Sequence, residues 1–404
     1  MHLVIIGGGQ AASSAAAKAR ELDGDIAITM ICEEPVLPYQ RPPLSKKYLS
    51  GEMPLERLVL RPQDWFDTQN VAVKTGARAE KIDRSSQSVT LSDGSELSYH
   101  RLLIATGSHA RRLPDEIGGS LEGVFCVRDL ADADALAPYV KAGGKAVIIG
   151  GGYIGLEGAA VARQAGMDVT VIEMGERILQ RVASSETSDF FRILHASHGV
   201  DIREGTSLSH ILQAGNEVSG VELSDGTRLE ADCVIVGIGI LPTVDLAEAA
   251  GLTINNGIAV DAHCRASDPD IFSAGDCASF PFKGERVRLE SVPNAIHQAE
   301  IAVANMLGDN LPYEAAPWFW SDQYDVKLQI AGLNRGYTHT VTRPGKREGA
   351  QSIWYYDNAD QLLAVDAMND APAFMMARRI IEGGGNISPE AAADPATNLK
   401  EFTP

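Results

Sequence analysis

Apolar residues along the chain form short runs that alternate with glycine turns and with stretches of helical spacing. Residues 2–6 form the first run, and residues 11–22 have the small apolar and charged positions typical of a helix that packs on a sheet. Residues 25–32 indicate a second strand. This order of strand, glycine turn, helix and strand predicts a βαβ unit with parallel strands.

The same pattern returns later in the chain. Strands are expected at residues 146–149 and 168–172, with a helix at residues 153–165 between them. Each half continues with a hairpin, and the turns are Asp93-Gly94 and Asp225-Gly226. Because the halves match element by element, we interpret them as an internal duplication of one βαβ-plus-hairpin plan. Other expected elements are strands at residues 71–77, 88–91, 101–105 and 231–236, a strand that begins near Ile271, and a helix at residues 294–307.

The pattern changes after Pro317. Residues 327–332, 336–342 and 351–356 have the composition of antiparallel strands, and a helix is expected at residues 371–382. The sequence therefore predicts an α/β protein with two Rossmann-like dinucleotide-binding domains and a C-terminal α+β domain.

The first glycine turn carries the dinucleotide fingerprint Gly7-x-Gly9-x-x-Ala12. Gly7 allows a tight turn, Gly9 lets the backbone approach a pyrophosphate, and Ala12 allows close contact between helix and strand. The helix N-terminus offers N–H groups and a positive dipole end to the phosphates. Glu33 lies 21 residues after Ala12, where a carboxylate can accept hydrogen bonds from a ribose, and its neighbour Glu34 is the alternative.

The second glycine turn carries the fingerprint Gly150-x-Gly152-x-x-Gly155. Glu173 lies 18 residues after Gly155, and a carboxylate there favours the 2′-hydroxyl of NADH over the 2′-phosphate of NADPH. Arg177 is close to this point, and an arginine of this kind keeps NADPH open as an alternative. Two fingerprints in one chain indicate that one dinucleotide passes electrons to another.

Glu157 follows the second fingerprint, and we expect it in the first turn of the helix. There it either favours the helix dipole or lies beside the nicotinamide.

Charge and length limit the function classes. The net charge of −19 argues against a nucleic-acid partner, and 404 residues predict two or three domains. The apolar stretches are too short to span a bilayer. The first apolar run begins almost at Met1, so we expect no signal peptide and a cytoplasmic protein.

The cysteines and histidines suggest no further redox or metal centre. No two cysteines form a C-x-x-C pair, which indicates buried single residues in a reducing compartment rather than a redox-active disulfide. The nine histidines show no H-E-x-x-H spacing, and we expect no metal site. The five cysteines are Cys32, Cys126, Cys233, Cys264 and Cys277.

The sequence PYQRPPLSK at residues 38–46 distinguishes between families. Together with ATG at residues 105–107, SAGD at residues 273–276 and WFWSDQ at residues 318–323, it closely resembles the NADH-dependent ferredoxin reductases. These FAD proteins serve bacterial cytochrome P450 and Rieske dioxygenase systems, and the likeness covers essentially the whole chain. It implies a fold like that of glutathione reductase. The implied domains are an FAD domain of residues 1–112 and 243–318, an NADH domain of residues 113–242 and a C-terminal domain of residues 319–404.

The resemblance also implies a role for each matching position. Lys46 would lie near the flavin N5, Asp276 at the ribityl chain, and the backbone of residues 290–292 at the pyrimidine end. Many relatives have an aromatic residue where this chain has Val292. The implied FAD residues are Gly7, Gly9, Ala12, Glu33, Arg41, Lys46, Ala105, Thr106, Gly107, Asp276, Ser291 and Val292. The implied NADH residues are Gly150, Gly152, Gly155, Glu157, Glu173 and Gly239.

The expected chemistry is hydride transfer from NADH C4 to FAD N5 over about 3–3.5 Å. Lys46 is the cation that we expect to stabilise the reduced flavin, and we hypothesise that it pairs with Glu157 across the flavin face. Electrons then leave singly to a [2Fe–2S] ferredoxin, which feeds a cytochrome P450 or a ring-hydroxylating dioxygenase. Trp320 lies on the electron path or shields the flavin from water. We expect a monomer.

Other reductases of this fold fit less well. Disulfide reductases need a cysteine pair by the flavin, and this chain has Pro42-Pro43-Leu44-Ser45 in that region. Two alternatives remain. One is a reductase whose acceptor is rubredoxin, and the other is a protein like apoptosis-inducing factor, which responds to NADH by changing its protein associations.

Overall fold

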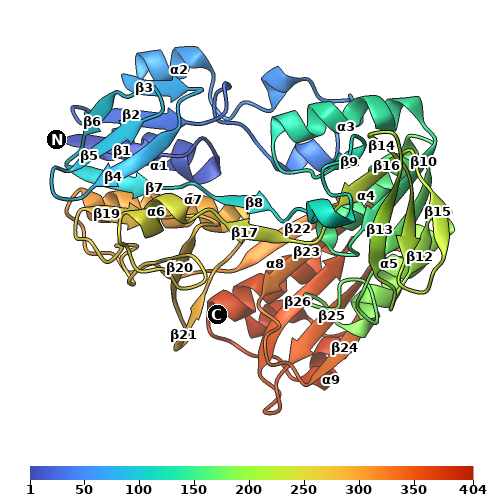
Figure 1. Cartoon of the computed structure of the whole chain (residues 1–404). Coiled ribbons are helices and arrows are strands. Elements are labelled where there is room, and N and C mark those ends of the chain that lie inside the picture. Colours follow the sequence, from blue (N-terminus) through green and yellow to red (C-terminus); the bar gives the residue numbers. More distant parts are fainter. Residues whose placement is uncertain (404) are drawn as a thin grey trace. The chain divides into compact units, whose positions relative to one another are not determined.

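The computed structural model describes residues 1–403, and the chain divides into two compact units (Figure 1). Unit 1 consists of Met1–Arg41, Pro54–His109 and Ile240–Pro317. Unit 2 consists of Pro42–Met53, Ala110–Gly239 and the chain from Trp318 onward. The end of the PYQRPPLSK segment therefore belongs to the same unit as the second fingerprint.

Unit 1 is built on a parallel sheet with the strand order β19-β7-β1-β2-β3. Helices α1 (Gln10–Leu22) and α7 (Val292–Met306) pack against each other and against this sheet (Figure 1). Most alanines of α1 are buried in the core, and their small side chains let the helix lie close to the strands. The strands are β1 (His2–Ile6), β2 (Ala27–Cys32), β3 (Val71–Thr75), β7 (Arg101–Ile104) and β19 (Ile271–Ser273).

Smaller elements complete unit 1. An antiparallel sheet is formed by β4 (Ala79–Asp83), β5 (Ser88–Leu91) and β6 (Glu96–Ser98), with the expected Asp93-Gly94 turn between the last two. The remaining elements are η2 (Leu55–Arg57), α2 (Gln63–Thr68), β17 (Ile240–Pro242), α6 (Asp245–Ala249), β18 (Ile258–Ala259), β20 (Ala278–Phe282) and β21 (Glu285–Val287).

Unit 2 repeats this plan with the parallel strand order β12-β11-β10-β16-β9. The strands are β9 (Val124–Phe125), β10 (Lys145–Ile149), β11 (Asp168–Ile172), β12 (Asp201–Arg203) and β16 (Cys233–Val236). The helices are α3 (Leu130–Ala142), α4 (Tyr153–Gln164) and α5 (Ser185–Ser197). A hairpin sheet of β13 (Leu208–Ala214), β14 (Glu217–Leu223) and β15 (Arg228–Glu230) corresponds to β4-β5-β6. The predicted duplication is therefore confirmed.

The C-terminal part of unit 2 is an antiparallel sheet with the order β22-β23-β26-β25-β24, next to α8 (Ala371–Glu382) and α9 (Pro389–Ala393). The expected strand at residues 336–342 begins at His339 instead, because residues 334–337 form a turn. The strands are β22 (Trp318–Gln323), β23 (Val326–Gly332), β24 (His339–Pro344), β25 (Gln351–Tyr356) and β26 (Leu362–Met368). Short elements elsewhere are β8 (Ser108–Ala110), η1 (Pro42–Ser45), η3 (Asp115–Ile117) and η4 (Leu399–Phe402).

Candidate functional site

The first fingerprint of unit 1 leaves open space in front of helix α1. Gly7 has φ +142°, and a Cβ there would lie 2.2 Å from the carbonyl oxygen of Ala105. A Cβ on Gly9 would meet no atom within 4 Å. Gly7 is therefore required by the close approach of two strand ends, whereas Gly9 leaves a free volume at the helix N-terminus. Ala12, one turn into α1, is fully buried.

Two of the longer helices begin without a side-chain cap. The N-cap residues of α1 and α4 are Gly9 and Gly152, and no described side chain accepts a hydrogen bond from their first turns. By contrast, α3, α5 and α8 begin at Asp129, Ser184 and Asp370, whose side chains do so. Uncapped N–H groups are left for an external acceptor, which fits the pyrophosphates of two dinucleotides.

Other predicted residues of unit 1 converge on the same edge of the sheet. Because β1, β7 and β19 are parallel, Gly7, Ala105 and the SAGD segment all follow the carboxyl ends of neighbouring strands. A Cβ on Gly275 would lie 3.2 Å from the Cβ of Ala11, so Asp276 follows a loop that touches α1. The Asp276 carboxylate accepts a hydrogen bond of 2.8 Å from Ser108.

The loop after β7 is held by Thr243. Thr106 Oγ1 donates to the Thr243 carbonyl at 2.7 Å, and the Thr243 N–H donates to the Gly107 carbonyl at 3.0 Å. These bonds fix the ATG segment at the sheet edge.

The acidic residues after β2 differ in their partners. Glu33 is mostly exposed, and its carboxylate lies 3.7 Å from Arg78. Glu34 forms an ion pair of 2.6 Å with Arg41 and accepts a hydrogen bond of 2.6 Å from Tyr39. The structure thus orients Arg41 through Glu34.

Helix α7 begins two residues earlier than expected. Ser291 is its N-cap, and its hydroxyl accepts a hydrogen bond from the Asn294 N–H at 3.3 Å. Val292 is therefore the first helical residue, and not part of a loop before the helix.

The second fingerprint of unit 2 repeats the steric logic of the first. A Cβ on Gly150, which has φ +105°, would lie 2.5 Å from the Gly237 carbonyl oxygen. A Cβ on Gly155 would lie 2.1 Å from the Gly150 carbonyl oxygen, so this position needs glycine. A Cβ on Gly152 would meet only the Gly237 carbonyl oxygen, at 4.0 Å. The carbonyl of Gly239 accepts a hydrogen bond from Arg111, which holds the loop after β16.

Glu173 is fixed by two backbone donors in unit 2. Its Oε2 accepts from the Gly151 N–H and its Oε1 from the Gly175 N–H, each at 2.7 Å. Ile149 pairs with Ile172 as Ile6 pairs with Ile31, so Glu173 occupies the place that Cys32 has in unit 1. The two halves therefore place their acidic residues one position apart.

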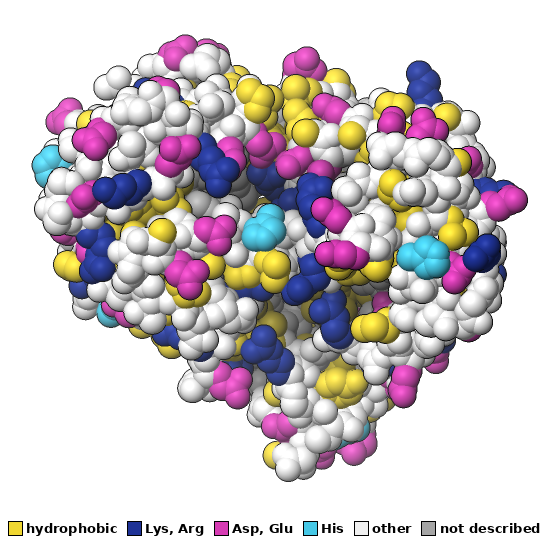
Figure 2. All heavy atoms as spheres, viewed as in Figure 1, with side chains coloured by type: hydrophobic (Ala, Val, Ile, Leu, Met, Phe, Trp, Pro, Cys, Tyr) yellow, Lys and Arg dark blue, Asp and Glu magenta, His cyan; other side chains and the backbone are white. Residues whose placement is uncertain are grey.

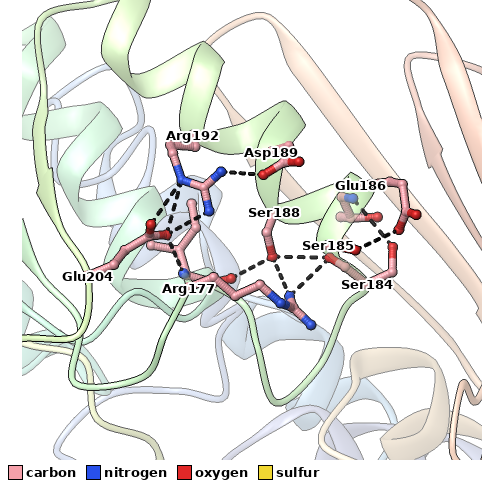
Figure 3. A network of polar contacts seen from close by, with 10 residues as sticks. Arg177, Ser184, Ser185, Glu186, Ser188, Asp189, Arg192 and Glu204 are labelled. Carbon is pink, nitrogen blue, oxygen red and sulfur yellow. Dashed lines mark hydrogen bonds and ion pairs between the residues drawn. The ribbon is translucent and has the colours of Figure 1, made fainter.

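The Arg177 side chain is bound within unit 2, at the start of α5. Figure 3 shows its guanidinium directed at the start of α5, where it donates to the carbonyls of Ala183 and Ser184 and to the Ser188 hydroxyl. The nearby Arg192 is paired with Glu204. Arg177 is thus engaged in a structural network, which removes the main sequence argument for NADPH.

Lys46 and Glu157 lie together in unit 2, as hypothesised. Lys46 Nζ is 3.2 Å from Glu157 Oε1 and 3.3 Å from Asp322 Oδ2. Ser45 and Ser321 donate to Glu157 at 2.9 and 2.6 Å. Burial raises the pKa of the Glu157 carboxyl, while Lys46 and the two hydroxyls lower it.

Glu157 was expected in the first turn of α4, and this was wrong. The helix begins at Tyr153, so Glu157 lies in the second turn, and the first turn contains no acidic residue. The dipole explanation for Glu157 therefore loses its basis, since the effect falls off within the first turn.

Trp320 lies on β22 and is partly exposed. Its ring centroid is 5.7 Å from that of Trp318, which in turn lies 5.8 Å from Phe374 of α8. The tryptophan is therefore part of a row of aromatic rings within unit 2.

The cysteines are all buried and free, and burial raises the pKa of the Cys32 and Cys233 thiols to about 12. A buried thiol with a raised pKa forms little thiolate, which argues against a redox role for Cys32 and Cys233. His195 on α5 and His198, which directly follows this helix, are three residues apart, but residues 1–403 contain no cluster of three His, Cys, Asp or Glu side chains that could hold a metal ion.

Among the helices of the described chain, none is long and apolar enough to cross a membrane. Figure 2 shows Lys and Arg side chains interspersed among Asp and Glu side chains on the visible face. On that face the acidic excess is spread out rather than gathered in one tract.

Two protein families match successive segments of the chain. The pyridine nucleotide-disulphide oxidoreductase family matches residues 1–299, and the reductase C-terminal family matches residues 318–403. Rhodocoxin reductase of Rhodococcus erythropolis is 41% identical over 402 residues, which cover 99% of this chain and 94% of the relative. The chain belongs to the ferredoxin reductases of this oxidoreductase family.

Solved structures agree with this assignment. This reductase matches the ferredoxin reductase for the CYP199A2 system of Rhodopseudomonas palustris with a TM-score of 0.95 at 38% identity, over 99% of each chain. It matches a chain of the covalent putidaredoxin reductase–putidaredoxin complex with a TM-score of 0.95 at 40% identity, over 99% of this chain and 97% of that chain.

Sequence reasoning missed four residues around Glu157. Ser45 lies in the PYQRPPLSK segment, and the WFWSDQ segment contains Ser321, Asp322 and Gln323. No role was assigned to these residues from the sequence. Their position inside those segments was the available signal. His195, on the unpredicted helix α5, gave no such signal.

Proposed function

We propose that this reductase takes a hydride from NADH onto bound FAD and passes single electrons to a [2Fe–2S] ferredoxin. The ferredoxin would feed a cytochrome P450 or a ring-hydroxylating dioxygenase. One observation carries the proposal: two helices of one chain begin at uncapped glycines, while every cysteine is buried and free. Two dinucleotides with no disulfide relay fit a reductase that gives electrons directly to a carrier.

The open edge of unit 1 fits FAD. Gly9 leaves room for a pyrophosphate, the first turn of α1 offers N–H groups, and Asp276 follows β19 of the same sheet. When bound, FAD supplies the hydride acceptor and the centre that releases electrons one at a time. We retain Glu33 as the ribose acceptor and Ser291 and Val292 as backbone contacts at the start of α7.

The open edge of unit 2 fits NADH. Glu173 is held by two backbone N–H groups, so its carboxylate is fixed where the adenosine ribose of a dinucleotide would lie. The inward-turned Arg177 leaves Glu173 to repel a 2′-phosphate. This arrangement supports a preference for NADH over NADPH.

Lys46 and Glu157 are the residues to which we assign the chemistry. Lys46 supplies a cation that stabilises negative charge at the reduced cofactor, and Glu157 holds the ammonium in place. A lysine that is only 16% exposed and shared by two carboxylates is oriented rather than free to move in solvent.

The experiment is an anaerobic acceptor assay with the FAD-loaded protein. NADH is added, followed by a [2Fe–2S] ferredoxin, rubredoxin or cytochrome c in separate reactions. We expect rapid reduction of ferredoxin. Cytochrome c should be reduced only when ferredoxin is present. Faster reduction of rubredoxin would instead identify the alternative acceptor.

The same assay tests the alternative in which the protein responds to NADH by changing its protein associations. A long-lived NADH–flavin charge-transfer band with negligible turnover on every carrier would contradict the proposed function. It would favour a protein like apoptosis-inducing factor.

A further inference from the structure

A row of buried polar side chains continues from Glu157 into the core of unit 2. Ser321 Oγ donates to Glu157 Oε1 at 2.6 Å, and Gln323 Nε2 donates to Ser321 Oγ at 3.2 Å. Gln323 Oε1 lies 2.8 Å from Nε2 of His195, on helix α5. Ser321, Gln323 and His195 are each at most 1% exposed. The row thus links α5 to the Glu157 carboxylate through strand β22.

The donors of this row are all oriented toward Glu157. A carboxylate only accepts, so the Ser321 hydroxyl donates to it and in turn accepts from the Gln323 amide. The amide oxygen of Gln323 then faces His195, which must carry its proton on Nε2. Aligned hydrogen bonds polarise one another, and here they stabilise negative charge on the carboxylate.

His195 is costly as a core residue. Its Nδ1 is buried and has no hydrogen-bond partner in the described part of the chain. Burial lowers the pKa of His195 to about 4, so the ring is neutral near pH 7. An apolar side chain would fill the same space without an unpaired nitrogen. The Nε2–H bond to Gln323 is the feature that an apolar residue could not supply.

The charge on Glu157 decides where Lys46 is held. The ammonium lies 3.2 Å from Glu157 and 3.3 Å from Asp322, so two carboxylates share it. Protonation of Glu157 would leave Asp322, which is 42% exposed, as the one carboxylate that attracts the ammonium. Any device that keeps Glu157 ionised therefore also fixes Lys46.

We propose that His195 and Gln323 are positioning residues, which hold the Ser321 hydroxyl toward Glu157 and so keep this carboxylate ionised beside Lys46. The inference rests on the proposed function, in which Lys46 stabilises the reduced cofactor. Neither residue is proposed to touch the coenzymes.

The test measures protonation of Glu157 by isotope-edited infrared spectroscopy of the FAD-loaded protein with labelled glutamate, without NADH or ferredoxin. The Glu157→Gln variant assigns the carboxyl band. Lys46 is the charged group that faces Glu157, and Asp322 shares the Lys46 ammonium. His198 and Tyr324 are titratable groups close to His195. Asp322→Asn, His198→Gln and Tyr324→Phe therefore serve as background variants.

Four variants distinguish the effect of the hydrogen-bonded row on Glu157 from the effect of core packing. Gln323→Met keeps the side-chain length and removes both hydrogen bonds, and Ser321→Ala removes the last donor. His195→Leu removes the Nε2–H, while His195→Gln replaces it with an amide N–H. Thermal unfolding confirms that each variant is folded.

The first three variants are expected to raise the pH at which Glu157 protonates by about one unit, a tenfold change in proton affinity. His195→Gln is expected to restore the wild-type value. An unchanged midpoint in folded Gln323→Met, or equal midpoints in His195→Leu and His195→Gln, would overturn the proposal.

The result is independent of the electron acceptor. If the midpoint shifts as expected but ferredoxin is not reduced, the proposed function fails and the positioning role stands. If ferredoxin is reduced and the midpoint stays constant, the positioning role fails alone.

Discussion

The ammonium of Lys46 lies 3.2 Å from the buried carboxylate of Glu157. Lys46 directly follows η1, at the place where a disulfide reductase would need cysteines, and Glu157 is on the helix that the second fingerprint begins. A single ion pair thus joins the segment expected near the flavin to the helix expected to bind NADH.

Removing the ammonium should slow hydride transfer. We expect Lys46→Met to lower the limiting rate constant of flavin reduction by NADH at least tenfold, because the reduced cofactor loses its stabilising cation. Anaerobic stopped-flow absorbance measures this rate. Lys47→Met, at the exposed neighbouring position, is the control and should have the wild-type rate. A wild-type rate in Lys46→Met would show that Lys46 has no part in hydride transfer.

Coenzyme preference should depend on Glu173 and not on Arg177. Glu173→Ala is expected to lower the ratio of kcat/KM for NADH to that for NADPH by tenfold or more, since the variant no longer repels a 2′-phosphate. Steady-state kinetics with both coenzymes provide the ratio.

Arg177→Met should instead destabilise the protein. Its donors to Ala183, Ser184 and Ser188 are lost, which costs about 1–3 kcal/mol. A lower Tm with an unchanged NADH preference is the expected outcome. A gain or loss of NADPH use in this variant would contradict the structural role.

Gly9 should matter for FAD and not for folding. A Cβ at Gly9 meets no protein atom, but it enters the space assigned to the pyrophosphate. We expect Gly9→Ala to fold and to lose most of its flavin on desalting, as measured by the flavin-to-protein absorbance ratio. Gly24→Ala, which also meets open space, is the matched control and should retain FAD.

Asp366 should make stability depend on pH. Burial raises the pKa of this carboxyl on β26 to about 6, so the folded state binds a proton that the unfolded state releases near pH 4. Stability from this group is therefore present at low pH and is lost as the pH rises through 6, by up to about 3 kcal/mol.

The Asp366→Asn variant isolates this effect. We expect the difference in Tm between this variant and wild type to grow in favour of the variant as the pH rises from 4.5 to 7.5. A constant offset between the two proteins does not affect this trend. Parallel Tm curves for the two proteins would show that Asp366 is ionised throughout.

Apolar runs bounded by turn residues were sufficient to locate much of the fold. The elements β1, β5, β11, β25 and α8 begin and end at the predicted residues, because each is bounded by glycine, proline or short polar turns. Strand β26 was missed, since it is covered on both faces and has Asp366 in the middle, so it shows no alternation of polar and apolar residues.

The site was predictable where spacing determines contact. The glycine fingerprints fix a strand end against a helix start within a few residues, and the Lys46–Glu157 pair followed from family positions. The direction of Arg177 depends on where α5 begins, and the bond between Gln323 and His195 depends on the contact of α5 with β22. No local pattern encodes either. Contacts between residues that are far apart in the sequence can be identified only once the fold is known.

The central claim is that electrons pass from NADH to the flavin and leave directly from it, with no cysteine relay. An anaerobic titration of the FAD-loaded protein with dithionite counts the electrons that it accepts. Two electrons per flavin, with complete bleaching of the flavin band at that point, is the result that we predict. Uptake of four electrons per flavin would show a second redox group and would contradict the claim.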